Sequence, residues 1–312
     1  MAHFRDRRAF GSVGTRRFRG ARYGDRKSPR FQGLLDLYPG AAAAYSLQAL
    51  SSGWVAGDVV EVRRSSDSAT QSFTASQITN GSLVAFCGAG DGYVSRLYDQ
   101  SGFGNDATQA VTTSQPKIVS AGALVDGGML FDNVDDVLET INTESFGTSS
   151  RSIFAVCAPN SITANADGIV QLSKSVATGE AWLLTPEVAT RANLTTWISS
   201  TPATLSQSNL ISNIYTSGNL HAGNAMWLNG AGVARTSGTD GSINTGTSEI
   251  RIGQGLNTST AFDGAISEIV IYKSDQSANR EGIETNINNR YNIYTPPVEG
   301  STFPMTLPLT LS

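Results

Sequence analysis

Short segments rich in apolar residues, each ended by Gly, Asn, Asp or Ser, follow one another through most of this chain. They lie at residues 59–67, 93–100, 116–120, 128–132, 152–158, 168–173, 181–185, 225–230, 249–255 and 265–272. Such segments are typical of β-strands joined by tight turns, and their density is that of a two-sheet structure. The pattern therefore predicts an all-β antiparallel sandwich.

Helical spacing is rarer. The stretch "PGAAAAYSLQALSS" predicts a short helix after Pro39, and "SLVAFCGAGDG" predicts another that ends at glycines. Near the C-terminus, Ile283, Ile287 and Tyr291 recur every four residues, with Ser277 as the expected cap. We expect one amphipathic helix to close the sandwich there.

The two ends of the chain differ from its body. Residues 1–33 hold ten of the 22 Lys and Arg residues but two of the 26 Asp and Glu residues, with no helical or strand period. Residues 295–312 open with two prolines and then alternate apolar and polar positions. We therefore expect a basic N-terminal arm (1–33), a β-sandwich (34–294) and an extended C-terminal arm (295–312).

The basic arm cannot bury a core by itself, so we expect a partner to order it. Docking on an acidic protein surface is the favoured interpretation, while phosphate binding by a nucleic-acid arm and a solubilising tail are the alternatives. The docking residues would be its arginines, which are Arg5, Arg7, Arg8, Arg16, Arg17, Arg19, Arg22, Arg26 and Arg30.

The C-terminal alternation predicts one further strand. Met305, Leu307, Leu309 and Leu311 would share a face of it, and Pro308 suits an edge position. The strand could join its own sheet or augment the sheet of a neighbouring subunit, so these four residues are also predicted as an inter-subunit strand.

Several classes of protein are not expected. No apolar run approaches the roughly 20 residues of a membrane helix, and the basic start has no signal-peptide core. Cys87 and Cys157 lie in apolar segments, as reduced core thiols do. With two histidines, His3 and His221, a Ser/His/Asp triad is disfavoured.

Several segments then show a resemblance. The segment from Ala44 to Val119, which includes "YVSRLYDQSGFGNDATQ", resembles the catalytic module of the fungal arabinofuranosidase B family and related modules of bacteriophage virion proteins. "LFDNVDDVLE" and "FDGAISEIVIYKSDQSANREGIETNINNRYNIY" are similar to signatures of concanavalin A-like, laminin-G-type modules. The resemblance implies a two-sheet antiparallel jelly roll with a C-terminal helix, and such modules often bind glycans.

The resemblance also implies where catalytic carboxylates would stand. The family's nucleophilic glutamate corresponds to the stretch 168–179, which contains no Asp or Glu, and its acid/base aspartate corresponds to Gly255. We therefore expect no catalytic residues and no enzyme. The alternative is an arabinofuranosidase-like glycoside hydrolase with relocated carboxylates at Glu180, Asp263 or Glu268.

Other polar clusters have structural interpretations. Asp99 and Gln100 are expected to bond backbone groups at a strand corner. Asp132, Asp135 and Asp136 are expected to do likewise, although their oxygens could coordinate Ca²⁺; no metal or other cofactor is otherwise expected. A weak glycan site is predicted from tryptophans and turn amides, namely Trp182, Trp197, Trp227, Asn229 and Asn257.

These features together predict a structural virion protein of a tailed phage or phage-like particle, made in the bacterial cytoplasm. Its partners would be capsid, portal or tail proteins, further copies of itself and a host polysaccharide. Membrane binding is not expected, and a nucleic-acid-associated protein is the remaining alternative.

Overall fold

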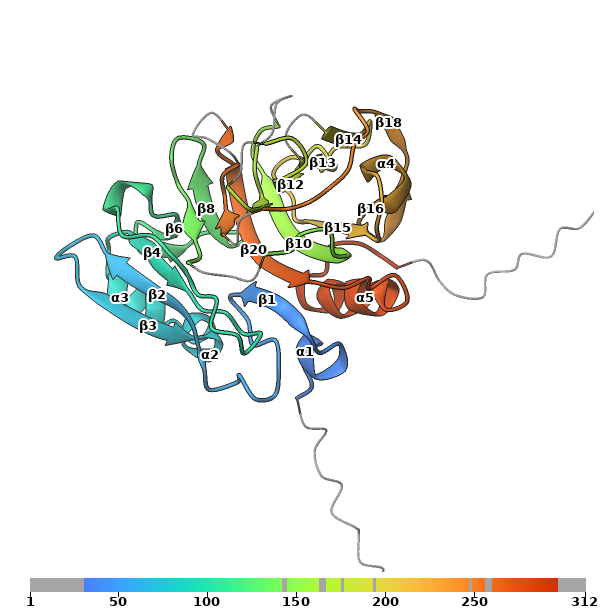
Figure 1. Ribbon diagram of the computed structural model, residues 1–312. Helices are drawn as coiled ribbons and strands as arrows, with labels where there is room; N and C mark the ends of the chain where they lie inside the picture. Colours follow the sequence, from blue (N-terminus) through green and yellow to red (C-terminus); the bar gives the residue numbers. More distant parts are fainter. Residues whose placement is uncertain are drawn as a thin grey trace, which may run out of the picture. The chain divides into compact units, whose positions relative to one another are not determined.

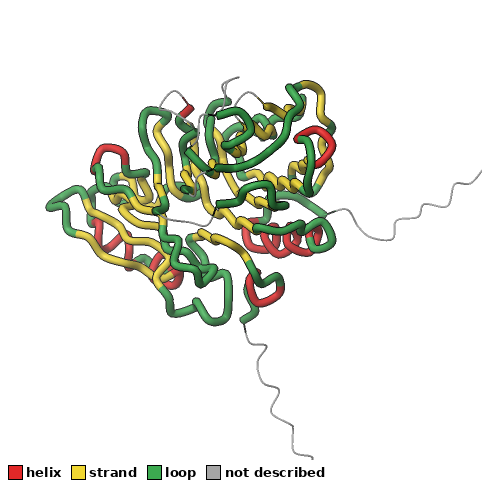
Figure 2. Tube along the Cα trace, in the orientation of Figure 1, coloured by secondary structure: helices red, strands yellow, loops and turns green. Residues whose placement is uncertain are grey.

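The structure, a computed structural model, is mostly β and contains one large antiparallel sheet (Figure 1). It describes residues 31–141, 145–162, 167–174, 177–192, 195–246, 249–255 and 260–296. Figure 2 shows how few helical segments interrupt the strands and loops. The coarse expectation of a β-rich antiparallel fold is confirmed.

The strand pairings form two runs. The first run centres on β20 (Asp263–Tyr272), which pairs with β10 (Arg151–Pro159) along one edge. Its other edge is shared by β1 (Ala41–Ser46) and β8 (Met129–Asp132). Beyond β10 the run continues through β15 (Asn209–Tyr215), β16 (Asn224–Leu228) and β17 (Ala231–Val233).

The second run is longer. In spatial order it comprises β3 (Thr70–Thr74), β2 (Asp58–Arg64), β4 (Gly92–Leu97), β5 (Ala107–Thr108), β9 (Leu138–Glu139), β19 (Ile250–Ile252), β11 (Val170–Leu172), β12 (Trp182–Thr185), β13 (Ala189–Ala192), β14 (Thr195–Ser199) and β18 (Arg235–Ser237). Strand β6 (Lys117–Ser120) pairs with both β4 and β8 and so joins the runs, and β7 (Ala123–Leu124) pairs with β6.

Strand β10 shows how the sequence builds two apolar layers. Successive side chains of a strand point to opposite faces of the sheet. Ile153, Ala155 and Cys157 join the main core with residues of the second run, while Phe154 and Val156 join a smaller cluster on the other face. The nine-residue strand is buried almost throughout because both of its faces are covered.

Helix α5 (Arg280–Tyr291) covers that second face, and Ile283 and Ile287 are its fully buried residues in the cluster (Figure 1). The predicted C-terminal helix is therefore confirmed. It begins after Asn279 rather than at the predicted Ser277 cap. Helix α1 (Leu34–Leu37) contributes Leu34 to the same cluster.

The predicted helix after Pro39 is wrong. Its alanines form strand β1, where Ala41, Ala43 and Ala44 are buried against β20 and the two apolar clusters. Alanine favours helices by intrinsic propensity, yet pairing with a long central strand outweighs a fraction of a kcal/mol per residue. The other predicted helix is confirmed as α3 (Ser82–Cys87).

The remaining helices are short: α2 (Ala75–Thr79), α4 (Leu220–Gly223) and a 3₁₀ turn at Thr112–Ser114. None of the described helices is long and apolar enough to cross a membrane. Cys87 and Cys157 are buried free thiols.

Candidate functional site

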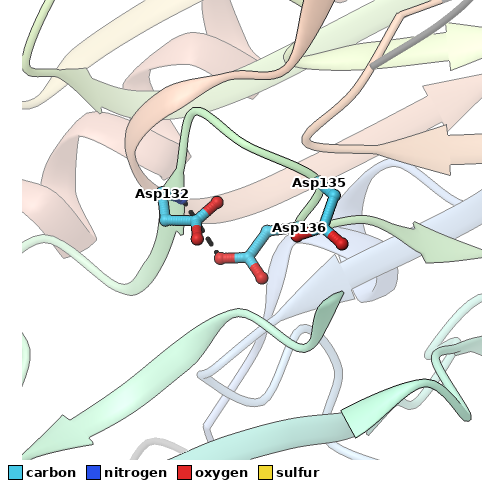
Figure 3. Close-up of side chains that lie close together, drawn as sticks. All are labelled: Asp132, Asp135 and Asp136. Carbon is cyan, nitrogen blue, oxygen red and sulfur yellow. Dashed lines mark hydrogen bonds between the residues drawn. The ribbon is translucent and has the colours of Figure 1, made fainter. Parts of the chain in front are cut away.

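The turn between β8 and β9 gathers three carboxylates, which we call the acidic turn: Asp132, Asp135 and Asp136 (Figure 3). One oxygen atom from each of them lies within 4.8 Å of the others. Asn133 adopts a positive φ of 63°, a conformation that asparagine tolerates better than most residues. This local geometry folds the chain back and brings the three side chains together.

Hydrogen bonds fix the acidic turn. The backbone N–H of Asp132 donates to the Asp136 carboxyl group at 3.1 Å, as Figure 3 shows, and the N–H of Val134 donates to Asp132 at 2.9 Å. The hydroxyl of Ser114 donates to Asp135 at 2.7 Å. The carboxyl groups are therefore pre-positioned before any ligand arrives.

Their surroundings differ. Asp132 is exposed, Asp135 is half-buried and Asp136 is buried. Burial, followed by the negative charges of Asp132 and Asp135, raises the pKa of Asp136 to about 7, while the Asp132 N–H and Lys117 act in the opposite direction. Asp136 therefore titrates near neutral pH, beside two other carboxyl groups.

The same oxygens are hard ligands of the kind that Ca²⁺ prefers. Three carboxylate oxygens would supply about half of the six to eight ligands that Ca²⁺ takes, with water for the rest. A bound cation would favour the ionised form of Asp136 and compete with its proton. The acidic turn can therefore act as an acid and base, or it can hold a cation. It cannot do both at the same time, because the cation and the proton compete for Asp136.

The relocated carboxylates named from the sequence lie in different places. Asp263 pairs with Asp132 across β20 and β8, beside the acidic turn, and accepts hydrogen bonds from Ser161 at 2.6 Å and Asn160 at 3.2 Å. Glu180 precedes β12 and lies close to Gly246.

Glu268 lies further along β20, where it is fully buried. Its carboxylate forms an ion pair with Arg290 and accepts hydrogen bonds from Ser46 at 2.9 Å and Tyr291 at 3.2 Å. Its charge compensates a largely buried guanidinium, which is a structural role.

The predicted glycan residues do not form one surface. Trp182 and Trp197 are buried in the main core, so neither can stack on a sugar. Trp227 is half-buried and covered by the Arg280 guanidinium, 4.5 Å from its ring centre. Asn229 accepts the Leu210 N–H within a tight turn, and Asn257 lies outside the described residues.

Asp99 and Gln100 form a buried corner. Asp99 accepts the Ala44 N–H at 2.9 Å, and Gln100 accepts the Leu50 N–H at 2.8 Å while it donates to the carbonyls of Ser46 and Gln48. These side chains satisfy backbone groups on either side of the end of β1, and nothing in this arrangement exposes them to a ligand.

Most of the two predicted arms lies outside the described residues. The predicted docking arginines and the predicted inter-subunit strand Met305, Leu307, Leu309 and Leu311 all lie outside the described residues.

Comparison with known proteins identifies solved structures with a similar fold. No protein-family model and no curated protein matches the chain. A GH54 α-L-arabinofuranosidase variant soaked with 4-nitrophenyl α-L-arabinofuranoside matches with a TM-score of 0.57 and 16% identity, covering 83% of this chain and 66% of that chain. An arabinofuranosidase complexed with arabinofuranosyl-α-1,2-xylobiose matches with a TM-score of 0.57 and 18% identity, covering 83% and 65%.

A third structure, a GH54 α-L-arabinofuranosidase with a cyclic sulfate inhibitor, has a TM-score of 0.54 and 16% identity, covering 83% of this chain and 66% of that chain. This chain thus spans about two thirds of the length of these chains. The similarity establishes a shared fold.

These comparisons correct two predictions. The chain was expected to be a structural virion protein and not an enzyme, but these similar structures are glycoside hydrolases, and no finding supports a phage context. The findings favour the glycoside hydrolase alternative. Two stretches without carboxylates do not establish that the chain lacks a catalytic site, and the predicted arms lie mostly outside the described residues.

Proposed function

We propose that this chain is a glycoside hydrolase of arabinofuranosidase-like fold whose catalytic centre is the acidic turn. One observation carries the proposal: the Asp136 carboxyl group, with its pKa raised to about 7, lies with Asp132 and Asp135 in a cluster in which one oxygen of each residue is within 4.8 Å of the others. Glycosidases use such a pair, one carboxyl group protonated as the acid and the other ionised.

The spacing favours retention of configuration. Retaining glycosidases hold their carboxyl groups about 5–5.5 Å apart, whereas inverting enzymes leave about 6.5–9.5 Å for a water molecule. In the first step, Asp136 gives its proton to the glycosidic oxygen, that oxygen leaves, and an oxygen of Asp132 forms a bond to the anomeric carbon. In the second step, Asp136 takes a proton from water, and the resulting hydroxide displaces Asp132.

Exposure assigns these roles. Asp132 is open to solvent and can reach a substrate, whereas Asp136 is buried and accepts a hydrogen bond from the Asp132 N–H. The charge of Asp135, which accepts a hydrogen bond from Ser114, raises the pKa of Asp136. Asp263, opposite Asp132 on β20, adds a fourth carboxyl group near the site.

The similar structures support one substrate class for this proposal. The similar structures are arabinofuranosidases, two of them with arabinofuranosides. We therefore assign terminal α-L-arabinofuranosyl units as substrates. In the same proposal, the two strand runs are the two sheets of a concanavalin-like jelly roll.

The test is hydrolysis of 4-nitrophenyl α-L-arabinofuranoside by the full chain. Asp136→Asn and Asp132→Asn are each expected to lower kcat by about 10²–10⁴-fold, as loss of an acid or nucleophile does. Asp58→Asn, an exposed carboxylate at the start of β2, is the matched control and should leave kcat unchanged. Absence of turnover by the wild-type chain on aryl furanosides and pyranosides would refute the proposed function.

Turnover that survives in both acidic-turn variants would refute the catalytic assignment alone. Glu180→Gln and Asp263→Asn should then be measured, because these are the other carboxylates outside a buried ion pair that the sequence analysis named.

A further inference from the structure

A cavity of about 240 Å³ lies against the face of the sheet that carries Asp132, and we call it the Asn160 cavity. Leu130 of β8 and Ala265 of β20, which pair across the two strands, line its floor. Alternate side chains of a strand share one face of a sheet, so Asp132 and its partner Asp263 lie on the same face, two residues further along. The cavity floor and the exposed carboxylate of the acidic turn are therefore about 7 Å apart along the strands.

A row of hydrogen-bonded groups joins the Asn160 cavity to the acidic turn. The backbone N–H of Asn160 donates to the carbonyl of Asp263 at 2.9 Å and extends the pairing of β10 with β20. The side-chain amide of Asn160 donates to the Asp263 carboxylate at 3.2 Å, and Ser161 donates to the same carboxylate at 2.6 Å. These bonds fix the Asn160 amide and leave its oxygen without a donor among the described residues.

The Asn160 cavity combines further polar groups with its apolar floor. The Asp126 carboxylate and the hydroxyls of Ser206 and Ser208 line it, and none of them has a hydrogen-bond partner within the described part of the chain. A sugar offers hydroxyls at its rim and C–H groups on its faces, which match such a lining. Asp126 is the one charged side chain among the described residues of this cavity, so a neutral sugar suits it better than an anionic one.

A larger cavity, of about 760 Å³, borders the Asn160 cavity. Asp126, Gly127 and Ser208 line both cavities. Gly127 lies directly on the floor between them, because a Cβ atom there would come within 3.4 Å of the methyl groups of Ala158 and Ala265. Its φ of 75° is accessible to glycine at little cost, and without a side chain the barrier between the cavities stays low.

The larger cavity has room for more than one sugar unit. Its volume lies within the 300–1,000 Å³ of ordinary ligand sites. Phe31, 48% exposed, offers a ring against which the C–H face of a sugar can pack, and Gln48 and Ser76 add groups that can bond hydroxyls.

We propose that the Asn160 cavity and the larger cavity form one groove, which binds the neutral carbohydrate chain that carries the bond cleaved at the acidic turn. Its ligand class rests on the proposed function, because the position beside Asp132 identifies the ligand as a glycoside. The sugar unit next to that bond occupies the Asn160 cavity, where the Asn160 amide oxygen and the Asp126 carboxylate accept its hydroxyls. Further units extend past Gly127 into the larger cavity, so the substrate is a sugar attached to a neutral polysaccharide.

The test is titration calorimetry of the full chain with three neutral trisaccharides, xylotriose, cellotriose and galactotriose, and with tri-galacturonic acid. The wild type should bind at least one neutral trisaccharide about tenfold more tightly than tri-galacturonic acid. Asn160→Ala should weaken neutral binding about fivefold, the loss expected for one hydrogen bond. Asp126→Asn should reduce the discrimination against tri-galacturonic acid.

Two further variants sharpen the result. Ser208→Tyr places a ring where the two cavities meet and should also weaken neutral binding. Gln71→Ala removes an exposed amide on β3, outside both cavities, and should bind as the wild type does. Thermal unfolding shows that each variant is folded.

Hydrolysis of 4-nitrophenyl α-L-arabinofuranoside by the wild type separates the two proposals. Turnover without binding of any neutral trisaccharide at millimolar concentration would overturn the groove and leave the proposed function. Binding that Asn160→Ala weakens, without turnover, would overturn the proposed function and keep the groove as a carbohydrate site. Folded Asn160→Ala and Ser208→Tyr that both bind like the wild type would refute the groove in either case.

Discussion

The backbone N–H of Asp132 donates a hydrogen bond of 3.1 Å to the carboxyl group of Asp136. The same residue acts on Asp136 in two opposite ways, because its carboxylate charge raises the pKa of Asp136 while its N–H lowers it. Burial exceeds both and leaves the pKa at about 7. Asp136 can therefore lose and regain a proton near neutral pH, as a group that is acid and then base in one cycle must.

The pH dependence of hydrolysis should follow Asp136. Because the first step needs its proton, kcat/KM should decline above about pH 7, tenfold for each further unit. Asp135→Asn removes one of the charges that raise this pKa, so it should move the alkaline limb to lower pH. A pH–rate profile of the two proteins checks this, and an unmoved limb would show that another group controls it.

The pH dependence of stability should also reflect the ionisation of Asp136. The pKa of Asp136 is higher in the folded chain than the value of about 3.9 in an unfolded one, so the folded state holds the proton more tightly. This contribution is complete below about pH 4 and is lost as the pH rises through about 7.

Asp136→Asn should remove this loss and raise the thermal midpoint at pH 8 relative to the wild type. Thermal unfolding followed by circular dichroism from pH 4 to 8 measures the effect, with Asp58→Asn as the control. If Asp136→Asn is more stable than the wild type and yet inactive, Asp136 is a catalytic residue that lowers the stability of the folded chain.

Calcium should inhibit rather than assist. A cation on the acidic turn would remove the proton that Asp136 must donate, so we expect EDTA to leave activity unchanged and millimolar Ca²⁺ to lower it. The opposite pattern, in which Ca²⁺ raises the thermal midpoint and Asp136→Asn abolishes that increase without any turnover by the wild type, would identify a structural cation site.

The pair of Glu268 and Arg290 should behave as a buried ion pair. The Glu268 side chain is fully buried and that of Arg290 is 13% exposed. Arg290→Met should lower the free energy of unfolding by about 3–5 kcal/mol, because it leaves a carboxylate buried without its partner.

The double variant Glu268→Gln with Arg290→Met should lose less than the two single variants together. Urea unfolding provides the measurement, and Arg64→Met, which breaks a solvent-exposed pair with Asp67, is the control with a much smaller effect. Additive losses in the double variant would contradict the assignment of a coupled pair.

Local sequence patterns correctly predicted the elements whose formation depends on nearby residues. The spacing of Ile283 and Ile287 was sufficient to find α5, and short apolar segments ended by turn residues were sufficient to indicate a β-rich fold. The alanines of β1 misled, because their partner strand β20 lies more than two hundred residues away and its pairing outweighs local propensity.

The candidate site was harder to predict, because its properties also depend on contacts between distant parts of the chain. The sequence shows that Asp132, Asp135 and Asp136 are neighbours, but the raised pKa of Asp136 depends on how deeply the turn is buried. The sequence did not show which tryptophans would lie within the core, where Trp182 is hydrogen-bonded to Asn213.

Strand β20 lies between β10 on one side and β1 and β8 on the other. On a ribosome, β1, β8 and β10 would emerge long before the strand that joins them, and each would wait with an unpaired edge. Such distant contacts slow folding, and open edges invite pairing with other chains. A nascent chain stopped before residue 263 would therefore lack the strand that joins these edges, and we expect it to need protection from aggregation until β20 has been synthesised.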